Sequence, residues 1–166
     1  MLPAIADIII KMIEFSEGNM HDIEHFLKVY AFAKTIGEKE GLDESSQYAL
    51  EAAAVLHDIA CPLCREKYGH ADGKLQEIEG GPLTRNFLNS FLVPVETKER
   101  IVWLVSHHHT YTNVELLEHR ILLEADFLVN AAESGYDREQ IAAAKRRFFR
   151  TKAGIGLLES IYKEAN

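Results

Sequence analysis

Three stretches of the 166-residue sequence place an imidazole or a carboxylate among apolar residues. His25 falls on the apolar face of a helix predicted over residues 20–40. His57 and Asp58 end the apolar run AAAVLHD, and Asp126 lies within LLEADFLVN. One such group is more often a core residue satisfied by a hydrogen bond. Several of them aimed inward from separate helices call for a shared partner, because burying them alone is costly.

A bound divalent cation would compensate all of these groups at once, whereas hydrogen bonds would leave carboxylate facing carboxylate. Two imidazoles and two carboxylates form a mixed nitrogen and oxygen donor set, which suits manganese, iron, zinc or magnesium. Four protein ligands on a six-coordinate ion leave two positions for water or substrate. The residue types therefore predict an open metal site built from His25, His57, Asp58 and Asp126.

The elements that must position these groups read as helices separated by short breaks. No segment shows the sustained alternation of a strand, so we predict an all-α helical bundle of about eight helices. The predicted helices cover residues 3–15, 20–40, 43 or 45 to about 59, 82–91, 95–111, 115–134, 137–150 and 154–164. Residues 60–81 are the least regular stretch, and Pro82 is expected to begin the next helix.

Charge and hydropathy narrow the classes of partner. A formal net charge of −8 argues against a nucleic-acid polymer or an anionic membrane surface. No apolar stretch reaches the roughly 18 residues of a membrane span. Asp7 and Lys11 interrupt the apolar opening of the chain, which also lacks a basic start. We therefore expect a cytoplasmic protein without a signal peptide.

Cys61 and Cys64 form a lone CxxC motif. Two cysteines cannot build a disulfide framework, and a structural zinc site would need two further ligands. We expect ordinary thiols in a loop, with a redox role as the open alternative.

The order of the chemical groups along the chain resembles the HD-domain superfamily of metal-dependent phosphohydrolases. The segment HFLKVYAFA is similar to the HxxRVxxxA helix of that family, with Lys28 where arginine is usual. AAAVLHDIA resembles its ALLHDI segment, and LLEADFLVN resembles its ADxL segment. The segments GKLQEIEGGPLTRNFL, SHHHTY and FFRTKAGIGLLESIY are similar to those of small stand-alone bacterial HD proteins.

The resemblance implies one HD domain over residues 1–166. Its metal-binding core would cover about residues 20–130, and C-terminal helices over residues 137–164 would pack on that core. His25, His57, Asp58 and Asp126 would be the primary metal ligands. Asp58 would also bridge a second ion or orient the attacking water.

The number of metal ions that the resemblance implies depends on whether a histidine stands near the start of one particular helix. Two-metal members of the family carry a histidine there, and the matching segment QEIEGGPLTR offers Gln76, Glu77 and Glu79 instead. His70 falls six residues too early to replace it. We expect one divalent ion (manganese, iron, magnesium or zinc), with a second as the open alternative.

Further residues are expected to act beside the metal. Glu77 and Glu79 are candidates for general acid or base, or else plain surface residues. Lys28, one turn beyond His25, is a candidate contact for phosphate. The remaining candidates for substrate contact are the histidine triplet and two cations at a break between helices: His107, His108, His109, Arg150 and Lys152. Consecutive helical residues point about 100° apart, so the whole triplet cannot face one site.

The expected function is hydrolysis of a phosphomonoester or phosphodiester by a metal-activated water. The substrate would be a nucleotide or another small phosphorylated metabolite. Two other functions stay open, namely a non-catalytic metal- and nucleotide-binding signalling module and a di-iron HD oxygenase. A homodimer is an open alternative for the assembly.

Overall fold

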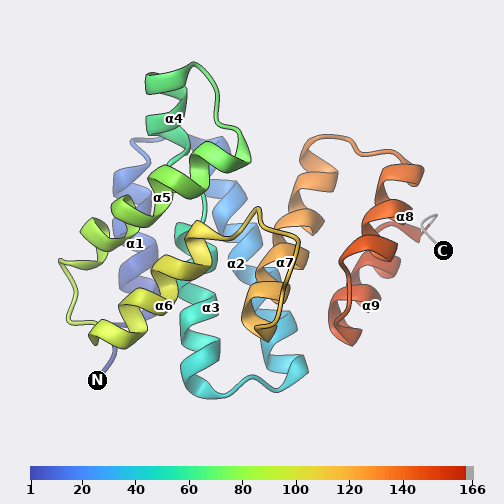
Figure 1. Ribbon diagram of the computed structural model, residues 1–166, viewed down its shortest axis with the longest axis horizontal. Helices are drawn as coiled ribbons and strands as arrows, with labels where there is room; N and C mark the ends of the chain where they lie inside the picture. Colours follow the sequence, from blue (N-terminus) through green and yellow to red (C-terminus); the bar gives the residue numbers. More distant parts are fainter. Residues whose placement is uncertain (164–166) are drawn as a thin grey trace.

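The described part of the chain, residues 1–163 of a computed structural model, contains nine α-helices and no strand (Figure 1). The helices are α1 (Ile5–Phe15), α2 (Met20–Glu40), α3 (Glu44–Leu56), α4 (Cys61–Tyr68), α5 (Gly73–Leu88), α6 (Val95–Ser106), α7 (Leu117–Glu133), α8 (Arg138–Arg147) and α9 (Lys152–Ile161). The predicted all-α fold is confirmed. Residue 164, the predicted end of the last helix, lies outside the described residues.

The stretch 60–81 is more regular than the sequence predicted, and it supplies the additional helix. In α4, Pro62 occupies the first turn, where its missing N–H costs nothing. The following helix, α5, is capped by the Asp72 carboxylate, which accepts the N–H of Leu75 at 2.9 Å. Cys61 and Cys64 are therefore buried helical residues rather than loop thiols. Burial raises the pKa of both thiols, which disfavours the reactive thiolate form.

The expectation that Pro82 begins a helix was wrong, because α5 runs through it. Two glycines precede the proline and let α5 approach α6 closely. A Cβ atom added at Gly81 would lie 2.7 Å from Ser106 Oγ, and one at Gly80 would lie 3.1 Å from Val105 Cγ1. Packing against α6 therefore holds α5 together where the proline removes a backbone hydrogen bond.

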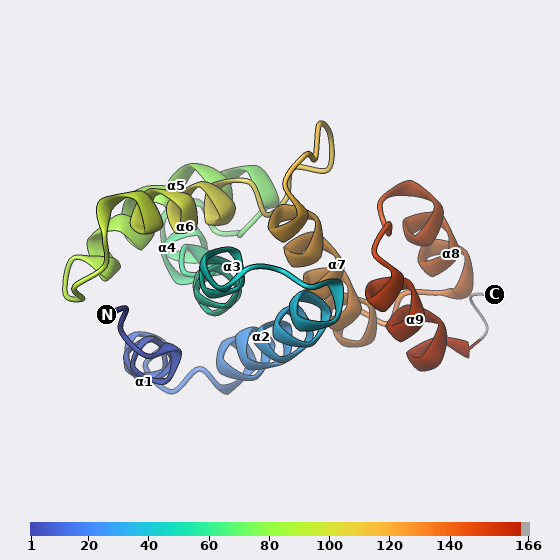
Figure 2. The same ribbon diagram turned by 90° about the horizontal axis from the view of Figure 1, so that it is seen from below.

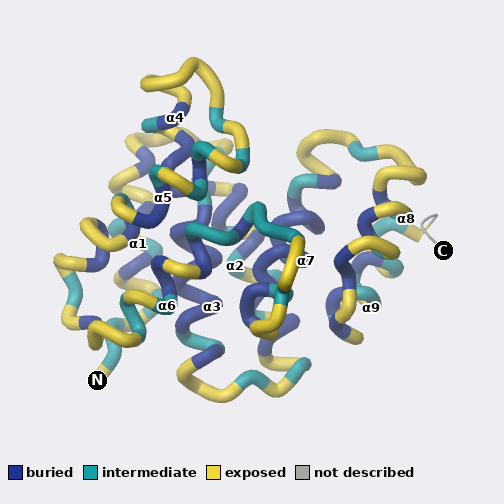
Figure 3. Tube along the Cα trace, viewed as in Figure 1, coloured by how far each residue is buried: buried dark blue, intermediate teal, exposed yellow. Residues whose placement is uncertain are grey.

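Helix α3 is the centre of the fold. It packs against α1, α2, α6 and α7, and it is buried continuously from Ala49 to Leu56. Figure 3 shows buried backbone along both α3 and α7. Helices α8 and α9 lie beyond α7, and α9 contacts both α2 and α7 (Figure 2). No helix among residues 1–163 has the length and apolar character needed to cross a membrane.

Glu124 of α7 ties the start of α9 to the rest of the fold. Its fully buried carboxylate accepts the backbone N–H groups of Arg150 at 2.6 Å and Thr151 at 3.0 Å. The Thr151 hydroxyl donates to the same carboxylate at 2.6 Å. Thr151 is also the N-cap of α9, so one buried side chain organises this junction.

We expect Glu124→Ala to lower the free energy of unfolding by about 2–4 kcal/mol, because it leaves buried donors without an acceptor. Chemical denaturation measures this change. Glu139→Ala, on the exposed surface of α8, is the control and should stay within about 0.5 kcal/mol of the unsubstituted protein. A Glu124→Ala variant as stable as this control would contradict the role assigned to the carboxylate.

Candidate metal centre

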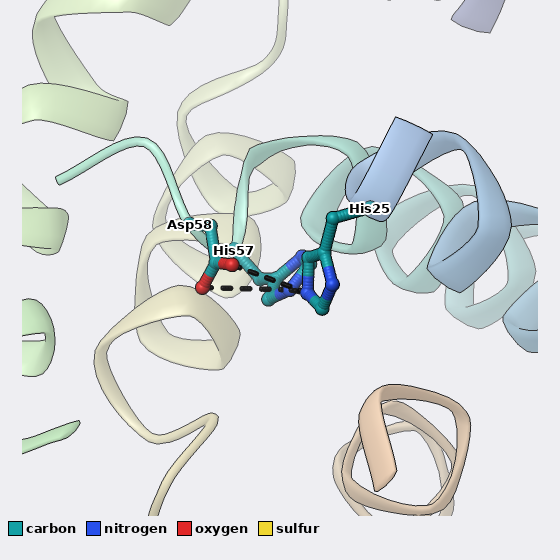
Figure 4. A group of neighbouring side chains, drawn as sticks. All are labelled: His25, His57 and Asp58. Carbon is teal, nitrogen blue, oxygen red and sulfur yellow. Dashed lines mark hydrogen bonds and ion pairs between the residues drawn. The ribbon is translucent and has the colours of Figure 1, made fainter. Parts of the chain in front are cut away.

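The four predicted ligands converge where α2, the end of α3 and α7 meet. His25 projects from α2, His57 and Asp58 follow the last turn of α3, and Asp126 lies in α7. Figure 4 shows His25, His57 and Asp58 pointing toward one another. We call these four residues the His–Asp cluster. Its three innermost members are 0–5% exposed, whereas the Asp58 side chain is 27% exposed.

The ligand-type atoms of the cluster crowd around one point. His25 Nε2 lies 3.1 Å from His57 Nε2, 3.1 Å from Asp126 Oδ1 and 3.2 Å from Asp58 Oδ2. His57 Nε2 lies 3.3 Å from the same Asp126 oxygen. Nitrogen ligands bind zinc at about 2.1 Å, so two ligands at a right angle are about 3.0 Å apart. The spacing of the cluster therefore fits donors arranged around a divalent cation.

The Nδ1 hydrogen bonds of the two imidazoles leave both Nε2 atoms directed at the Asp126 carboxylate, where a cation could bind. His25 Nδ1 donates to Glu133 Oε2 at 2.8 Å, and His57 Nδ1 donates to the Ala54 carbonyl at 2.7 Å. Because these oxygens only accept, both protons reside on Nδ1. A neutral ring then presents a lone pair at Nε2 to the carboxylates of the cluster. Only a cation or an extra proton relieves that repulsion.

The pKa shifts of the described residues show that the His–Asp cluster favours a bound positive charge. Burial opposes the charging of His25, but its hydrogen bond to Asp126 and the charge of Asp58 outweigh burial and raise its pKa to about 10. Burial also opposes ionisation of Asp126, yet hydrogen bonds from His25 and His57 hold its pKa well below the usual range. The pKa of Asp58 is lowered despite burial, mainly by the charge of His57 and a hydrogen bond from His108. The carboxylates thus stay ionised and attract a proton or a cation.

A second group of ligand-type atoms adjoins the cluster through Asp58. His108 Nδ1 donates to the Val105 carbonyl at 2.7 Å, and His108 Nε2 lies 3.4 Å from Asp58 Oδ1. The Nε2 atoms of His108 and His109 are each 3.1 Å from Gln76 Oε1. Burial and the neighbouring His108 lower the pKa of His109 to about 4, so this ring is neutral at pH 7. Asp58, His108 and His109 are close enough to share an ion.

Comparison with known proteins identifies the family. A family model described as "HD domain" matches residues 22–144. The chain belongs to the HD-domain family. A solved structure, the "predicted HD superfamily hydrolase" of an uncultured Thermotogales bacterium, is 22% identical with a TM-score of 0.67, covering 96% of this chain and 83% of that one. It is similar in fold. No curated protein shows significant similarity to the chain.

The histidine triplet of this HD domain lies in the turn after α6, and its three rings take different directions. His108 turns inward to the cluster, and His109 lies at its edge against Gln76. His107 points elsewhere: its ring stacks on Trp103 with centroids 4.1 Å apart, and its Nδ1 donates to the Trp103 carbonyl at 2.7 Å. The structure therefore brings two of the three predicted histidines to the site.

The two acidic candidates of α5 differ in their surroundings. Glu77 Oε1 accepts the N–H of His109 at 3.0 Å and the hydroxyl of Thr110 at 2.7 Å, so it supports the histidine turn. Glu79 accepts from Lys67 Nζ at 2.7 Å, on the side of α4. Hydrogen bonds, that from Lys67 foremost, lower the pKa of Glu79, so it is an ion-paired carboxylate away from the cluster.

The three predicted cations lie outside the cluster. Lys28 is about half exposed, with its Nζ 4.0 Å from Glu133 Oε1. The Arg150 guanidinium donates to the carbonyls of Arg146 and Arg147, which end α8, and to that of Phe149. Lys152 lines a groove of about 520 Å³ between α2 and α9. Among the interactions of residues 1–163, none joins Arg150 or Lys152 to the His–Asp cluster.

One residue at the site, Glu133, has no counterpart among the predicted site residues, and another, Arg147, contacts a residue just beyond the histidine turn. Glu133 follows Asp126 by seven residues, two helical turns, so the helical period places both on one face of α7. Arg147 belongs to a charge run typical of a solvated face, yet its Cζ lies 5.8 Å from the ring centroid of Tyr111, four residues beyond the start of the histidine turn. Only the fold reveals that contact.

Proposed function

We propose that this HD protein is a metal-dependent phosphohydrolase that acts on a nucleotide or another small phosphorylated metabolite. One observation carries the proposal: the Nε2 atoms of His25 and His57 face two ionised carboxylates at 3.1–3.5 Å while both Nδ1 positions are occupied by hydrogen bonds. This arrangement supports binding of a divalent cation and leaves it one accessible side, next to Asp58.

The residues of the His–Asp cluster would have different roles in hydrolysis. A bound divalent cation supplies Lewis acidity, which lowers the pKa of water and neutralises charge on a phosphoryl oxygen. His25, His57 and Asp126 are the buried ligands and exclude solvent from behind. Asp58 uses Oδ2 toward His25 and Oδ1 toward His108, so it stands at the junction of the two groups. From there its carboxylate can orient a water toward the substrate and accept its proton.

Phosphate binding calls for a positive charge besides the metal, and we assign Arg147 to it. The only described contact of its guanidinium is with the Tyr111 ring, and no ion pair joins it to a carboxylate among residues 1–163. Tyr111 follows the histidine turn along the chain; burial raises the pKa of its hydroxyl, and the charge of Asp126 raises it further. Lys28, by contrast, faces the carboxylate of Glu133.

The direct test is a screen of the purified, metal-quantified protein against a panel of phosphorylated metabolites. Metal-dependent release of phosphate or of a nucleoside monophosphate is the expected result. A metal-loaded protein that turns over none of the panel would contradict the proposal. Oxygen consumption would indicate the oxygenase alternative, and tight nucleotide binding without turnover would indicate the signalling module.

For a substrate found in this way, we expect Arg147→Ala to raise KM by about 10- to 100-fold with a smaller change in kcat, because a charge-assisted contact to the phosphate is lost. Arg146→Ala is the matched control, since Arg146 is the exposed neighbour on the same helix. Steady-state phosphate release measures both variants. Equal KM values for the two would rule out Arg147 as the phosphate contact.

A further inference from the structure

We infer that Glu133 is a positioning residue of the metal centre: it fixes the tautomer, the ring orientation and the basicity of His25. This inference rests on the metal-dependent function proposed above. Glu133 Oε2 accepts the proton of His25 Nδ1 at 2.8 Å. The His25 side chain is 6% exposed and that of Glu133 is 16% exposed, although the Glu133 residue as a whole, at the end of α7, is exposed.

The source of the hydrogen bond sets His25 apart from the other inward histidines. His57 and His108 donate their Nδ1 protons to carbonyls three residues earlier in their own chain segments, Ala54 and Val105. Those acceptors are backbone atoms close to each histidine, so no side-chain substitution removes them. His25 instead relies on a side chain from a different helix, α7, which packs against α2. The orientation of the His25 ring therefore depends on one side chain, which a substitution can remove.

A carboxylate does more than a carbonyl in this position. Its negative charge increases the basicity of the imidazole and so strengthens Nε2 as a metal ligand. Lys28, one turn after His25, lies 4.0 Å from the other Glu133 oxygen. Asp126 and Glu133, two turns apart on α7, thus act on the same imidazole from opposite sides, at Nε2 and Nδ1.

The test compares Glu133→Ala and Glu133→Gln with Glu66→Ala, an exposed glutamate of α4. Mn²⁺ affinity is measured from the paramagnetic resonance of the free ion. We expect Glu133→Ala to bind Mn²⁺ about 10- to 100-fold more weakly, as is typical when a residue behind a metal ligand is lost. Glu133→Gln should fall between, because its amide oxygen still accepts from Nδ1 but carries no charge. The control should bind as the unsubstituted protein does.

A second readout follows the hydrogen bond itself. In the Zn²⁺-loaded protein, the His25 Nδ1 proton should give a downfield nuclear magnetic resonance signal that shifts upfield in Glu133→Gln and disappears in Glu133→Ala. Mn²⁺ affinity within twofold of the unsubstituted protein in Glu133→Ala, or an unchanged downfield signal in Glu133→Gln, would overturn the inference. If Glu133→Ala fails to fold, the nearly isosteric Gln variant still decides it.

The outcome is separable from that of the proposed function. A protein that binds Mn²⁺ through Glu133-supported His25 but hydrolyses none of the panel contradicts the hydrolase and supports the positioning role. A hydrolase whose Mn²⁺ affinity ignores Glu133 contradicts only the positioning role.

Discussion

Replacing Asp58 by Ala is expected to lower metal-dependent hydrolysis by about three orders of magnitude or more. Among residues 1–163, the substitution removes the one carboxylate that reaches both His25, at 3.2 Å, and His108, at 3.4 Å. It also removes the exposed member of the cluster, where a substrate would enter. Elemental analysis should show the metal content falling with the activity, because a ligand and a net negative charge are lost together.

The control for this experiment is His70→Ala. His70 is an exposed histidine whose one described ion-pair partner is Asp72, at 3.5 Å, and it should keep both metal and activity near the unsubstituted values. Because Asp58 lies at the end of α3 and is partly exposed, its replacement should leave the helical circular dichroism unchanged. An Asp58→Ala variant that retains its full metal content would refute the ligand assignment.

The metal-free protein is expected to lose a few kcal/mol of stability as the pH rises from about 6.5 to about 10. The pKa of His25 is raised from 6.5 to about 10 in the folded state, because contacts with Asp126 and Asp58 outweigh burial. A group with a raised pKa contributes its full stabilisation below its unfolded value and loses it as the pH passes the folded value. His57, whose pKa is also raised, acts in the same direction.

Metal should reverse this dependence. A cation replaces the protons on the imidazoles, so its affinity increases as the pH rises, and the stabilisation by Mn²⁺ should be larger at pH 9 than at pH 6. Thermal unfolding across this range, with a chelator or with excess Mn²⁺, measures both trends. His25→Gln removes the titrating ring and is expected to flatten the metal-free curve. A metal-free protein equally stable at pH 6.5 and 10 would contradict the protonated cluster.

On the acidic side the carboxylates dominate. Asp58 and Asp126 have lowered pKa values in the folded state, so their stabilisation is present above about pH 3.8 and is lost as the pH falls toward those lowered values.

The sequence was most informative where chemistry and helical period coincide. His25 and Asp126 were found because each is polar on an apolar helical face, and a face is a local property of the chain. The four side chains do meet in the fold, and their role as ligands stays a prediction for the metal measurements. Glu133 lies on the same helical face as Asp126. Glutamates near helix ends are commonly solvated surface residues, however, so the helical period alone does not identify it.

Where the sequence misled, contacts between distant segments decided the outcome. Pro82 is a helix starter by local rules, and only the close packing of α5 on α6 explains why the helix continues through it. From the sequence, Arg150 is a cation available to bind phosphate. In the fold, its guanidinium donates hydrogen bonds to the last two carbonyls of α8 and to that of Phe149. Neither result can be read from residues a few positions away.

The glycines of α5 affect the space next to the proposed metal site. Gly80 and Gly81 meet α6, and a Cβ atom at Gly73 would lie 2.7 Å from His109 Cγ. Three absent methyl groups thus set how near α5 comes to the histidine turn, and at that separation one amide oxygen of Gln76 reaches both rings. The separation of α5 from the histidine turn, and with it the space left for an ion beside these rings, is therefore set by glycines whose backbone lies directly against neighbouring side chains.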